Sequence, residues 1–323
     1  MLDTLKFVQG AVSKKSLLPA LSAYRIHNNS ITAYNGELAI GSPIEIDGSF
    51  LPKAQPFFKA IQQCASETSL TLTDAGNLSV RSGAFRATIP CLPSGDAIEI
   101  EPEGDSHIFN GEGLLKALQT VLPFIGNDAS RPWSNGVLFK DQCLTATTNA
   151  LLVQVWVPDL QMPTLNLPMQ AAREVVRVGE APKSMLFADR SATFLYENDR
   201  WIKSHLLSTK WPNLDSVLQP REGEMADAPP AGFFDGLRAI ADFADPTYKS
   251  VYFRDNGLHT TQTGNDGASY TFDEPFTHKG CYNIEQLLKL DGIVDAIDFA
   301  AYPEKSVFYG PGNIRGFLVG MRA

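Results

Sequence analysis

The predicted secondary-structure elements of this 323-residue chain occur in an order that repeats three times. Each cycle begins with an apolar helical pattern, continues through alternating strands, adds a second helix and ends with further strands. In the first cycle the helices are expected at 7–24 and 52–65, and the turn Asn35-Gly36 joins two strands between them. One cycle takes about 108 residues, a common size for a domain. The repeat therefore predicts three similar α+β domains in tandem.

The second and third cycles continue the pattern. Their helices are expected at 109–125, 167–179, 231–244 and 282–292. In the third cycle the turn Asn256-Gly257 again separates two strands. The acidic stretch 96–105 and the stretch 220–230, rich in Pro, Glu and Ala, have the composition of linkers. The predicted domains are residues 1–105, 106–220 and 221–323.

Composition excludes several classes of protein. With 44% hydrophobic and 20% charged residues, the chain can bury a large core and is not disordered. It contains no run of the roughly 18 apolar residues that a membrane helix needs. The first ten residues lack the apolar core of a signal peptide, so we expect a cytoplasmic protein without a membrane partner. The four cysteines include no Cys-x-x-Cys pair, which argues against a zinc ribbon or a disulfide scaffold.

The sequence contains little that predicts catalysis. The common motifs of nucleotide-binding proteins, zinc proteases and serine hydrolases are missing. The five histidines are scattered, with no pair at the spacing of metal ligands. We therefore expect no catalytic residue, no metal and no cofactor. Two other classes stay open as alternatives: a sheet-rich hydrolase with two converging carboxylates, and a virion structural protein built from repeated α+β units.

Charge differs between the predicted helices and the rest of the chain. The formal net charge of −9, taken alone, argues against a nucleic-acid partner. The six predicted helices nevertheless hold nine of the 27 basic residues and only six of the 36 acidic ones. Helices that shared one basic surface would attract a polyanion, although solvated helices often carry Lys and Arg without such a role. The nine basic residues are Lys14, Lys15, Lys53, Lys59, Lys116, Arg173, Arg177, Arg238 and Lys289.

Short motifs along the chain occur in the order found in one known family. They are Val80-Arg81-Ser82-Gly83, Asn135-Gly136-Val137-Leu138-Phe139, Trp211-Pro212-Asn213-Leu214 with Val217-Leu218, and the C-terminal Phe317-Leu318-Val319-Gly320-Met321-Arg322-Ala323. In this order and spacing they resemble the bacterial DNA polymerase III beta subunit, the DNA sliding clamp. The resemblance coincides with the threefold repeat and extends over nearly the whole chain.

The resemblance implies a fold and a function. It implies three tandem clamp-type domains, each with two helices packed on antiparallel sheets, and a head-to-tail homodimer that closes a six-domain ring with its helices inside. Such a ring would be a non-catalytic processivity factor that encircles double-stranded DNA of any sequence. Because topology retains the DNA, the helix cations that line the hole need to attract phosphates only weakly. The replicative DNA polymerase and the clamp loader would bind through short linear motifs.

The resemblance also implies two contact surfaces. A hydrophobic pocket for partner peptides would be formed by Thr148, Leu152, Val153, Pro212, Val217, Tyr248, Asn283, Val319 and Met321. An apolar cleft of this kind suits a motif with aromatic or Leu anchors, although ordinary core positions would explain Val153, Val217 and Val319 equally well. The dimer interface would be formed by Phe85, Ala87 and Ile89 on one side and Phe243 on the other.

The sequence departs from the family at the rim of this pocket. The family's Thr-Asp-Gly-His-Arg-Leu stretch is matched to Thr148-Asn149-Ala150-Leu151-Leu152-Val153, which lacks the His and the Arg. Gly320 and Ala323 stand where the family has Pro and Leu. These departures indicate a divergent clamp, of cellular or phage origin, whose partners use altered motifs.

Overall fold

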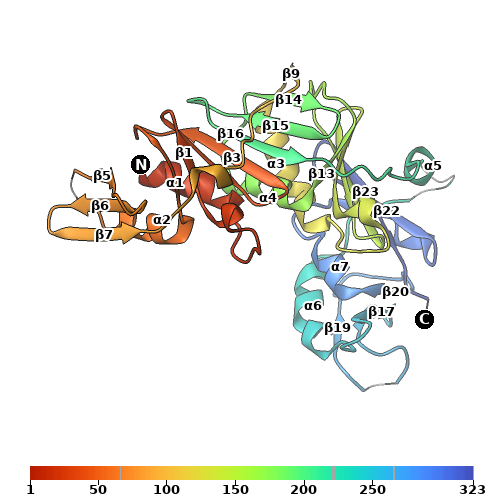
Figure 1. Cartoon of the computed structure of the whole chain (residues 1–323). Coiled ribbons are helices and arrows are strands. Elements are labelled where there is room, and N and C mark those ends of the chain that lie inside the picture. Colours follow the sequence, from red (N-terminus) through yellow and green to blue (C-terminus); the bar gives the residue numbers. More distant parts are fainter. Residues whose placement is uncertain (66, 220–222, 224, 265, 323) are drawn as a thin grey trace. The chain divides into compact units, whose positions relative to one another are not determined.

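The computed structural model describes residues 1–65, 67–219, 223, 225–264 and 266–322 (Figure 1). Within these residues, each of three cycles contains a helix, four strands, a second helix and three strands. The repeat predicted from the sequence is therefore confirmed. No helix in the described part of the chain is long and apolar enough to span a membrane.

The first cycle has the shortest connections between its early strands. Its elements are α1 (Leu2–Val8), β1 (Arg25–His27), β2 (Ser30–Tyr34), β3 (Leu38–Pro43), β4 (Ser49–Pro52), α2 (Ala54–Gln62), β5 (Ser69–Leu72), β6 (Leu78–Ser82) and β7 (Phe85–Ile89). Two short strands follow, β8 (Cys91–Leu92) and β9 (Asp105–Ile108).

The second and third cycles have the same order of elements. The second contains α3 (Gly111–Val121), β10 (Gly136–Lys140), β11 (Cys143–Thr147), β12 (Leu151–Trp156), β13 (Leu165–Pro168), α4 (Met169–Val178), β14 (Ser184–Ala188), β15 (Ser191–Leu195) and β16 (Trp201–His205). After α5 (Asp215–Leu218), the third contains α6 (Phe233–Ile240), β17 (Ser250–Arg254), β18 (Gly257–His259), β19 (Ser269–Thr271), β20 (Gly280–Asn283), α7 (Ile284–Leu288), β21 (Ala296–Ile297), β22 (Lys305–Gly310) and β23 (Ile314–Val319).

Two large antiparallel sheets each join strands of consecutive cycles. One has the order β8-β4-β1-β2-β3-β16-β15-β14-β9, with β3 paired to β16, and the other has the order β13-β10-β11-β12-β23-β22-β21, with β12 paired to β23. A four-stranded sheet, β19-β18-β17-β20, belongs to the third cycle alone, and a three-stranded sheet, β5-β6-β7, belongs to the first. Because strands are shared in this way, the second cycle is divided between two sheets.

The chain forms two compact units that follow this sharing of strands. Unit one comprises 1–115 and 170–207, and unit two comprises 116–169 and 208–323. In unit one, Phe7 packs edge-on against Tyr196 with ring centroids 5.8 Å apart. In unit two, Phe233 packs against Phe253 at 5.9 Å, inside a larger aromatic cluster. The division into the predicted domains 1–105, 106–220 and 221–323 stays a prediction.

The first helix lies earlier in the chain than predicted, and the expectation of a helix over 7–24 is wrong. Helix α1 ends at Val8 and continues only as a short 3-10 turn. A Cβ at Gly10 would collide with the carboxylate of Glu174, so the backbone there approaches α4 closely. Farther on, the hydroxyl of Ser16 accepts a hydrogen bond from the Leu18 backbone at 3.0 Å, which competes with helix formation.

Because the observed helix bounds differ from the predicted ones, several residues expected on helices lie outside them. Lys14 and Lys15 lie in an exposed loop and not on a helix. Pro52, expected in the first turn of a helix, is the last residue of β4, and Lys53 precedes the first residue of α2. Lys289 follows the last residue of α7.

Candidate functional site

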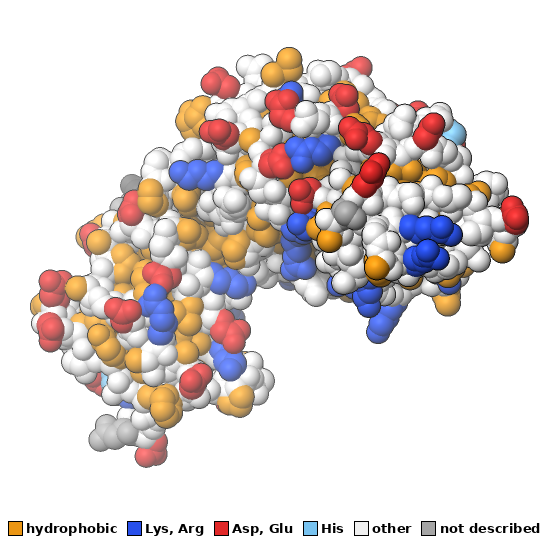
Figure 2. All heavy atoms as spheres, turned by 90° about the vertical axis from the view of Figure 1, so that its left-hand side faces the viewer, with side chains coloured by type: hydrophobic (Ala, Val, Ile, Leu, Met, Phe, Trp, Pro, Cys, Tyr) orange, Lys and Arg blue, Asp and Glu red, His pale blue; other side chains and the backbone are white. Residues whose placement is uncertain are grey.

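The predicted excess of basic residues on the helices is largely lost when the observed helix bounds are used. Helices α1, α2, α3, α4, α6 and α7 together carry six basic and five acidic residues. The predicted concentration of cations was wrong because four of the nine residues, Lys14, Lys15, Lys53 and Lys289, lie outside the helices. Side chains of both signs are interspersed on the face of the molecule in Figure 2.

Three of the nine predicted cations are on helices and free to meet phosphate. Lys59 on α2, Lys116 on α3 and Arg173 on α4 are exposed, and none has an ion pair among the described residues. Lys14, Lys15 and Lys53 are also exposed but lie in or beside loops. The exposed and unpaired part of the predicted positive surface is therefore smaller than expected, and its helical part comes from the first two cycles.

Arg177 holds α1 in place and is not a free cation. Its Nη1 donates to the Lys6 carbonyl at 3.1 Å and its Nη2 donates to the Phe7 carbonyl at 2.8 Å. Its Nε donates to Oε2 of Glu174 at 2.6 Å. Because carbonyls in the last turn of a helix lack a partner within the helix, Arg177 caps the C-terminal end of α1.

We expect Arg177→Ala to lower the stability of the protein by about 1–2 kcal/mol, because two carbonyls of α1 lose a charged donor. The melting temperature should fall by roughly 2–6 °C. Arg173→Ala is the matched control, since Arg173 lies one turn away on the same helix, is exposed and makes no ion pair among the described residues. Equal melting temperatures for the two variants, measured by differential scanning calorimetry, would contradict the capping role.

The two predicted helix cations of the third cycle, Arg238 and Lys289, are less available than those of the first two cycles. Arg238 pairs with Asp235, Nη1 to Oδ1 at 3.0 Å, and also with Asp291. Burial lowers the pKa of Lys289. Helices α6 and α7 therefore offer little attraction for phosphate.

The predicted peptide pocket contains an apolar cluster on one face of the large sheet of unit two. Leu152 on β12, Val307 on β22 and Phe317 on β23 are buried side by side. Strand register places Phe317 opposite both other residues. Partly buried side chains of the α5 segment pack on this cluster, namely Leu214, Val217 and Leu218. The ammonium of Lys305 donates to the Val217 carbonyl and fastens the segment there.

Val153 does not belong to this surface, so its assignment to the pocket is wrong. Successive residues of a strand face opposite sides of the sheet, and Val153, next to Leu152, is fully buried. Asn149 has the left-handed backbone angle φ of 73°, a conformation that suits the Gly of the family's motif. The match to that motif therefore begins one residue earlier, at Thr147, and its final Leu is Leu152. A slip of one residue exchanges the two faces of a strand.

Hydrogen bonds connect three other predicted pocket residues through α7. Thr148 Oγ1 donates to Oε1 of Gln286 at 3.2 Å. The backbone N–H of Gln286 donates to Oδ1 of Asn283 at 3.1 Å, which caps the N-terminus of α7. Asn283 Nδ2 donates to the Tyr248 carbonyl at 3.0 Å. Thr148, Asn283 and Tyr248 are thereby brought into one network.

The remaining predicted residues form exposed or anchored parts of the same region. Tyr248 is 65% exposed and Val319 is 39% exposed, which leaves apolar surface for a ligand. Pro212 is also exposed. Met321 is held by its backbone, because its N–H donates to the Cys281 carbonyl at 2.7 Å and its carbonyl accepts from the Tyr302 hydroxyl at 2.8 Å.

Strand β7, which carries the predicted dimer residues Phe85, Ala87 and Ile89, is an edge strand of its sheet. Phe85 and Ala87 are half-buried and Ile89 is buried. Phe243 lies in a 3-10 turn after α6 and is 65% exposed. These residues are available at one sheet edge and one surface turn.

The strand order indicates which edge would complement β7. The first four strands of each cycle have equivalent orders: β4-β1-β2-β3, β13-β10-β11-β12 and β20-β17-β18-β19. The strand that comes third in the chain order of such a set lies at the end of the set in the sheet. It pairs with the last strand of the next cycle, as β3 does with β16 and β12 does with β23. Among the strands that the structure describes, this rule gives β19 and β7 no partner within the chain.

Comparison with known proteins establishes what this fold is. No family model and no curated protein matches the sequence. Solved structures match over 100% of this chain and 97% of theirs: a DNA polymerase sliding clamp from Bacillus subtilis (15% identity, TM-score 0.82), a DNA polymerase beta subunit from Streptococcus pyogenes (16%, 0.85) and a sliding clamp from Bartonella birtlesii bound to griselimycin (18%, 0.83). The chain has the sliding-clamp fold. The low identity is that of a divergent sequence.

The tertiary fold brings residues to the predicted pocket that the sequence pattern missed. Leu214, Leu218, Val307, Phe317 and Gln286 come from distant segments that only the shared sheet and α7 bring together. The signal that could have found Phe317 and Val307 is alternation along two adjacent strands, counted from Val319.

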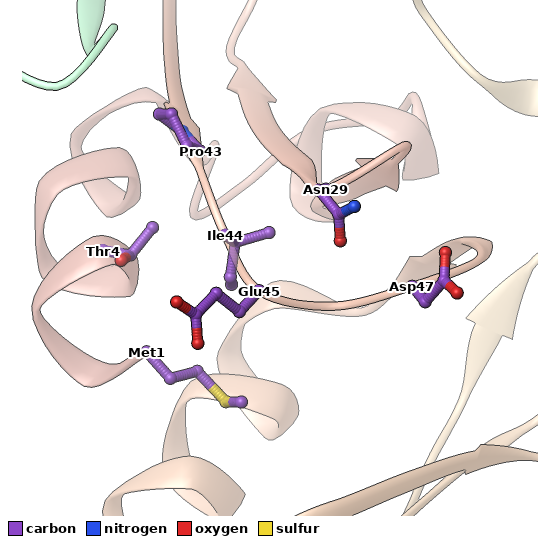
Figure 3. Close-up of a pocket in the computed structure, with 7 residues that line it drawn as sticks. All are labelled: Met1, Thr4, Asn29, Pro43, Ile44, Glu45 and Asp47. Atoms are coloured by element: carbon purple, nitrogen blue, oxygen red, sulfur yellow. The ribbon is translucent and has the colours of Figure 1, made fainter.

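The structure gives no support to the hydrolase alternative. A cavity of about 900 Å³ in unit one has two carboxylates in its lining, Glu45 and Asp47. Figure 3 shows Glu45 beside Met1 and Asp47 farther along the same loop, so the two do not converge on one point. Among the described residues, no three His, Cys, Asp or Glu side chains gather as a metal site requires.

Proposed function

We propose that this protein is a DNA polymerase processivity factor, a cytoplasmic sliding clamp in which two chains close head to tail around duplex DNA. The observation that carries the proposal is the pair of unmatched sheet edges at opposite ends of the repeat, β7 and β19. Pairing β7 of one chain with β19 of the other would repeat the arrangement seen twice within each chain. Two such contacts would close the assembly and cover both edges.

The proposed activity needs no catalytic residue, because a closed ring retains DNA by topology. Lys59, Lys116 and Arg173 would attract phosphates through mobile side chains and intervening water. Contacts of this kind carry no sequence information, so the ring could slide. Few unpaired cations are an advantage here, since tight binding would oppose movement.

The replicative polymerase and the clamp loader would bind at the region that contains Leu152, Val217, Tyr248 and Val319. Its exposed apolar side chains suit a short motif with Leu or aromatic anchors. Clamps of this fold are known with ligands: those from Bartonella birtlesii and Pseudomonas aeruginosa are described as bound to griselimycin. A clamp from C. crescentus is described with polyethylene glycol bound to a putative beta-motif tethering region.

The mass of the protein in solution tests this proposal. Size exclusion with light scattering at micromolar concentration should give twice the chain mass of 35.3 kDa. A virion structural protein would instead form large assemblies. A strict monomer or an open-ended series of oligomers would contradict the closed dimer.

A further inference from the structure

A groove next to the apolar pocket cluster has no part in the function proposed above. It lies on the large sheet of unit two and has a volume of about 400 Å³. Its lining consists of Cys143, Gln154, Trp156, Tyr309, Gly312, Asn313, Ile314 and Arg315. Trp156 is 46% exposed, which is unusual for so large an apolar side chain.

The groove is continuous with the pocket cluster along the strands. Leu152, Gln154 and Trp156 occupy alternate positions of β12 and therefore point to the same face of the sheet. On β23, Phe317 pairs with Leu152, and Arg315 pairs with Gln154. Four residues of extended chain span about 13 Å, so one peptide four or five residues long can reach from Leu152 to Trp156.

Arg315 gives the groove a positive charge, which favours an acidic ligand. Its Nε donates to Oε1 of Gln154 at 2.8 Å, which orients the guanidinium. Arg315 is exposed and has no ion pair within the described ranges. A guanidinium held in this way can accept a carboxylate with its remaining N–H groups.

Trp156 supplies an apolar wall beside this charge, and its backbone is anchored to Asn313. Its backbone N–H donates to the Asn313 carbonyl at 3.0 Å, and the Asn313 side chain donates to the Trp156 carbonyl. Cys143 stands opposite Trp156 in the strand register, and burial raises the pKa of its thiol, so it contributes apolar surface. The groove thus combines one cation with an exposed apolar surface.

We propose that this groove binds an acidic residue and a neighbouring apolar residue that flank the clamp-binding motif of a partner protein. The proposal rests on the proposed function, because it extends the same peptide site along β12. A peptide is favoured over nucleic acid, since a single cation cannot hold a polyanion, whereas one carboxylate beside an aromatic wall is a common peptide contact.

The test uses fluorescein-labelled synthetic peptides of three designs and the full-length protein. The first contains a Leu-Phe anchor, three Gly/Ser residues and Asp-Phe; the second has Asn in place of the Asp; the third ends after the spacer. The first two designs are each made in two orders, with the flanking pair either before or after the anchor. Fluorescence anisotropy gives their affinities for the wild type, Arg315→Gln, Trp156→Ala and the pocket variant Val319→Asp.

For the better of the two orders, the Asp peptide should bind wild type about five- to tenfold more tightly than the Asn peptide. This preference should vanish in Arg315→Gln. Trp156→Ala should weaken both long peptides while leaving the anchor peptide unchanged. In the wild type, the Asp peptide should also shift the indole N–H resonance of Trp156, which tests the contact without any substitution.

The outcomes separate this inference from the proposed function. Equal binding of the Asp and Asn peptides in both orders, with loss in Val319→Asp, would overturn the groove and leave the pocket intact. Failure of all three peptides to bind wild type would contradict the pocket itself. A shift of the Trp156 resonance by single-stranded oligothymidylate and not by the Asp peptide would overturn the choice of a peptide.

Discussion

Replacement of Thr88 by proline is expected to convert the dimer into a monomer. The β6–β7 hairpin turns at Gly83-Ala84, with Gly83 at φ of 58° and Ser82 paired to Phe85. In a two-residue hairpin the flanking pair is hydrogen-bonded, and bonded pairs then alternate along the ladder. The N–H groups of Phe85 and Ala87 therefore point toward β6, and that of Thr88 points toward the open edge.

Proline at this position removes an outward donor and places a ring where the partner strand would lie. An acceptor of the partner strand left without its donor costs about 1–3 kcal/mol at each contact, which corresponds to an interface roughly 5- to 150-fold weaker. A closed dimer has two interfaces, so the monomer should dominate at micromolar concentration. The fold should survive, because the bonds to β6 are kept.

Thr88→Val is the matched control for this prediction. It keeps the backbone N–H and a β-branched side chain, so the dimer should persist. Phe243→Asp should also weaken the dimer, because it puts a carboxylate at the predicted interface in place of a phenyl ring. The Phe243 side chain is 65% exposed in the single chain. Sedimentation velocity over a range of concentrations measures both. A Thr88→Pro variant as dimeric as the wild type would exclude strand addition at β7.

Reversal of the charge of the three unpaired helix cations should strongly lower the affinity of the protein for duplex DNA. Lys59→Glu, Lys116→Glu and Arg173→Glu together change six positions in a dimer. If each contacts a phosphate, the slope of log affinity against log salt should fall by about 5. The affinity for duplex DNA should fall at least 100-fold at about 0.1 M salt, because six attractions become repulsions.

A triple variant with the same change in net charge provides the control. Lys140, Lys183 and Lys249 are basic residues outside the helices, and each is ion-paired. Their reversal should leave the affinity for duplex DNA and its salt dependence nearly unchanged. Equal losses of affinity in the two triple variants would show that overall charge, and not these helix positions, governs DNA binding. Both variants should remain dimeric in sedimentation experiments.

The sequence predicted the repeat and most helices because these depend on local periodicity. Helices α3 and α4 lie within the predicted ranges 109–125 and 167–179, with ends that differ by a few residues. The error at α1 arose because apolar spacing continues past Gly10, while the close approach of Glu174 that fixes the backbone there comes from a distant helix.

Residue roles were harder to predict because they depend on tertiary contacts. A basic residue on a helix can face solvent, as Arg173 does, or cap another helix, as Arg177 does, and local sequence does not distinguish the two. At the pocket, matching one residue too late added Val153, which lies on the other face of β12 from Leu152. The sharing of sheets between cycles could not be predicted, since it depends on which strands of distant segments pair.

Retention on circular DNA tests the closed ring most directly. The protein is loaded onto a nicked circular plasmid, separated from free protein by gel filtration, and the plasmid is then cut once with a restriction enzyme. The protein should stay with the circle in about 0.1 M salt and be lost within minutes of linearisation, because it slides off the ends. Equal retention on circular and linear DNA would mean binding by affinity and would contradict a closed ring.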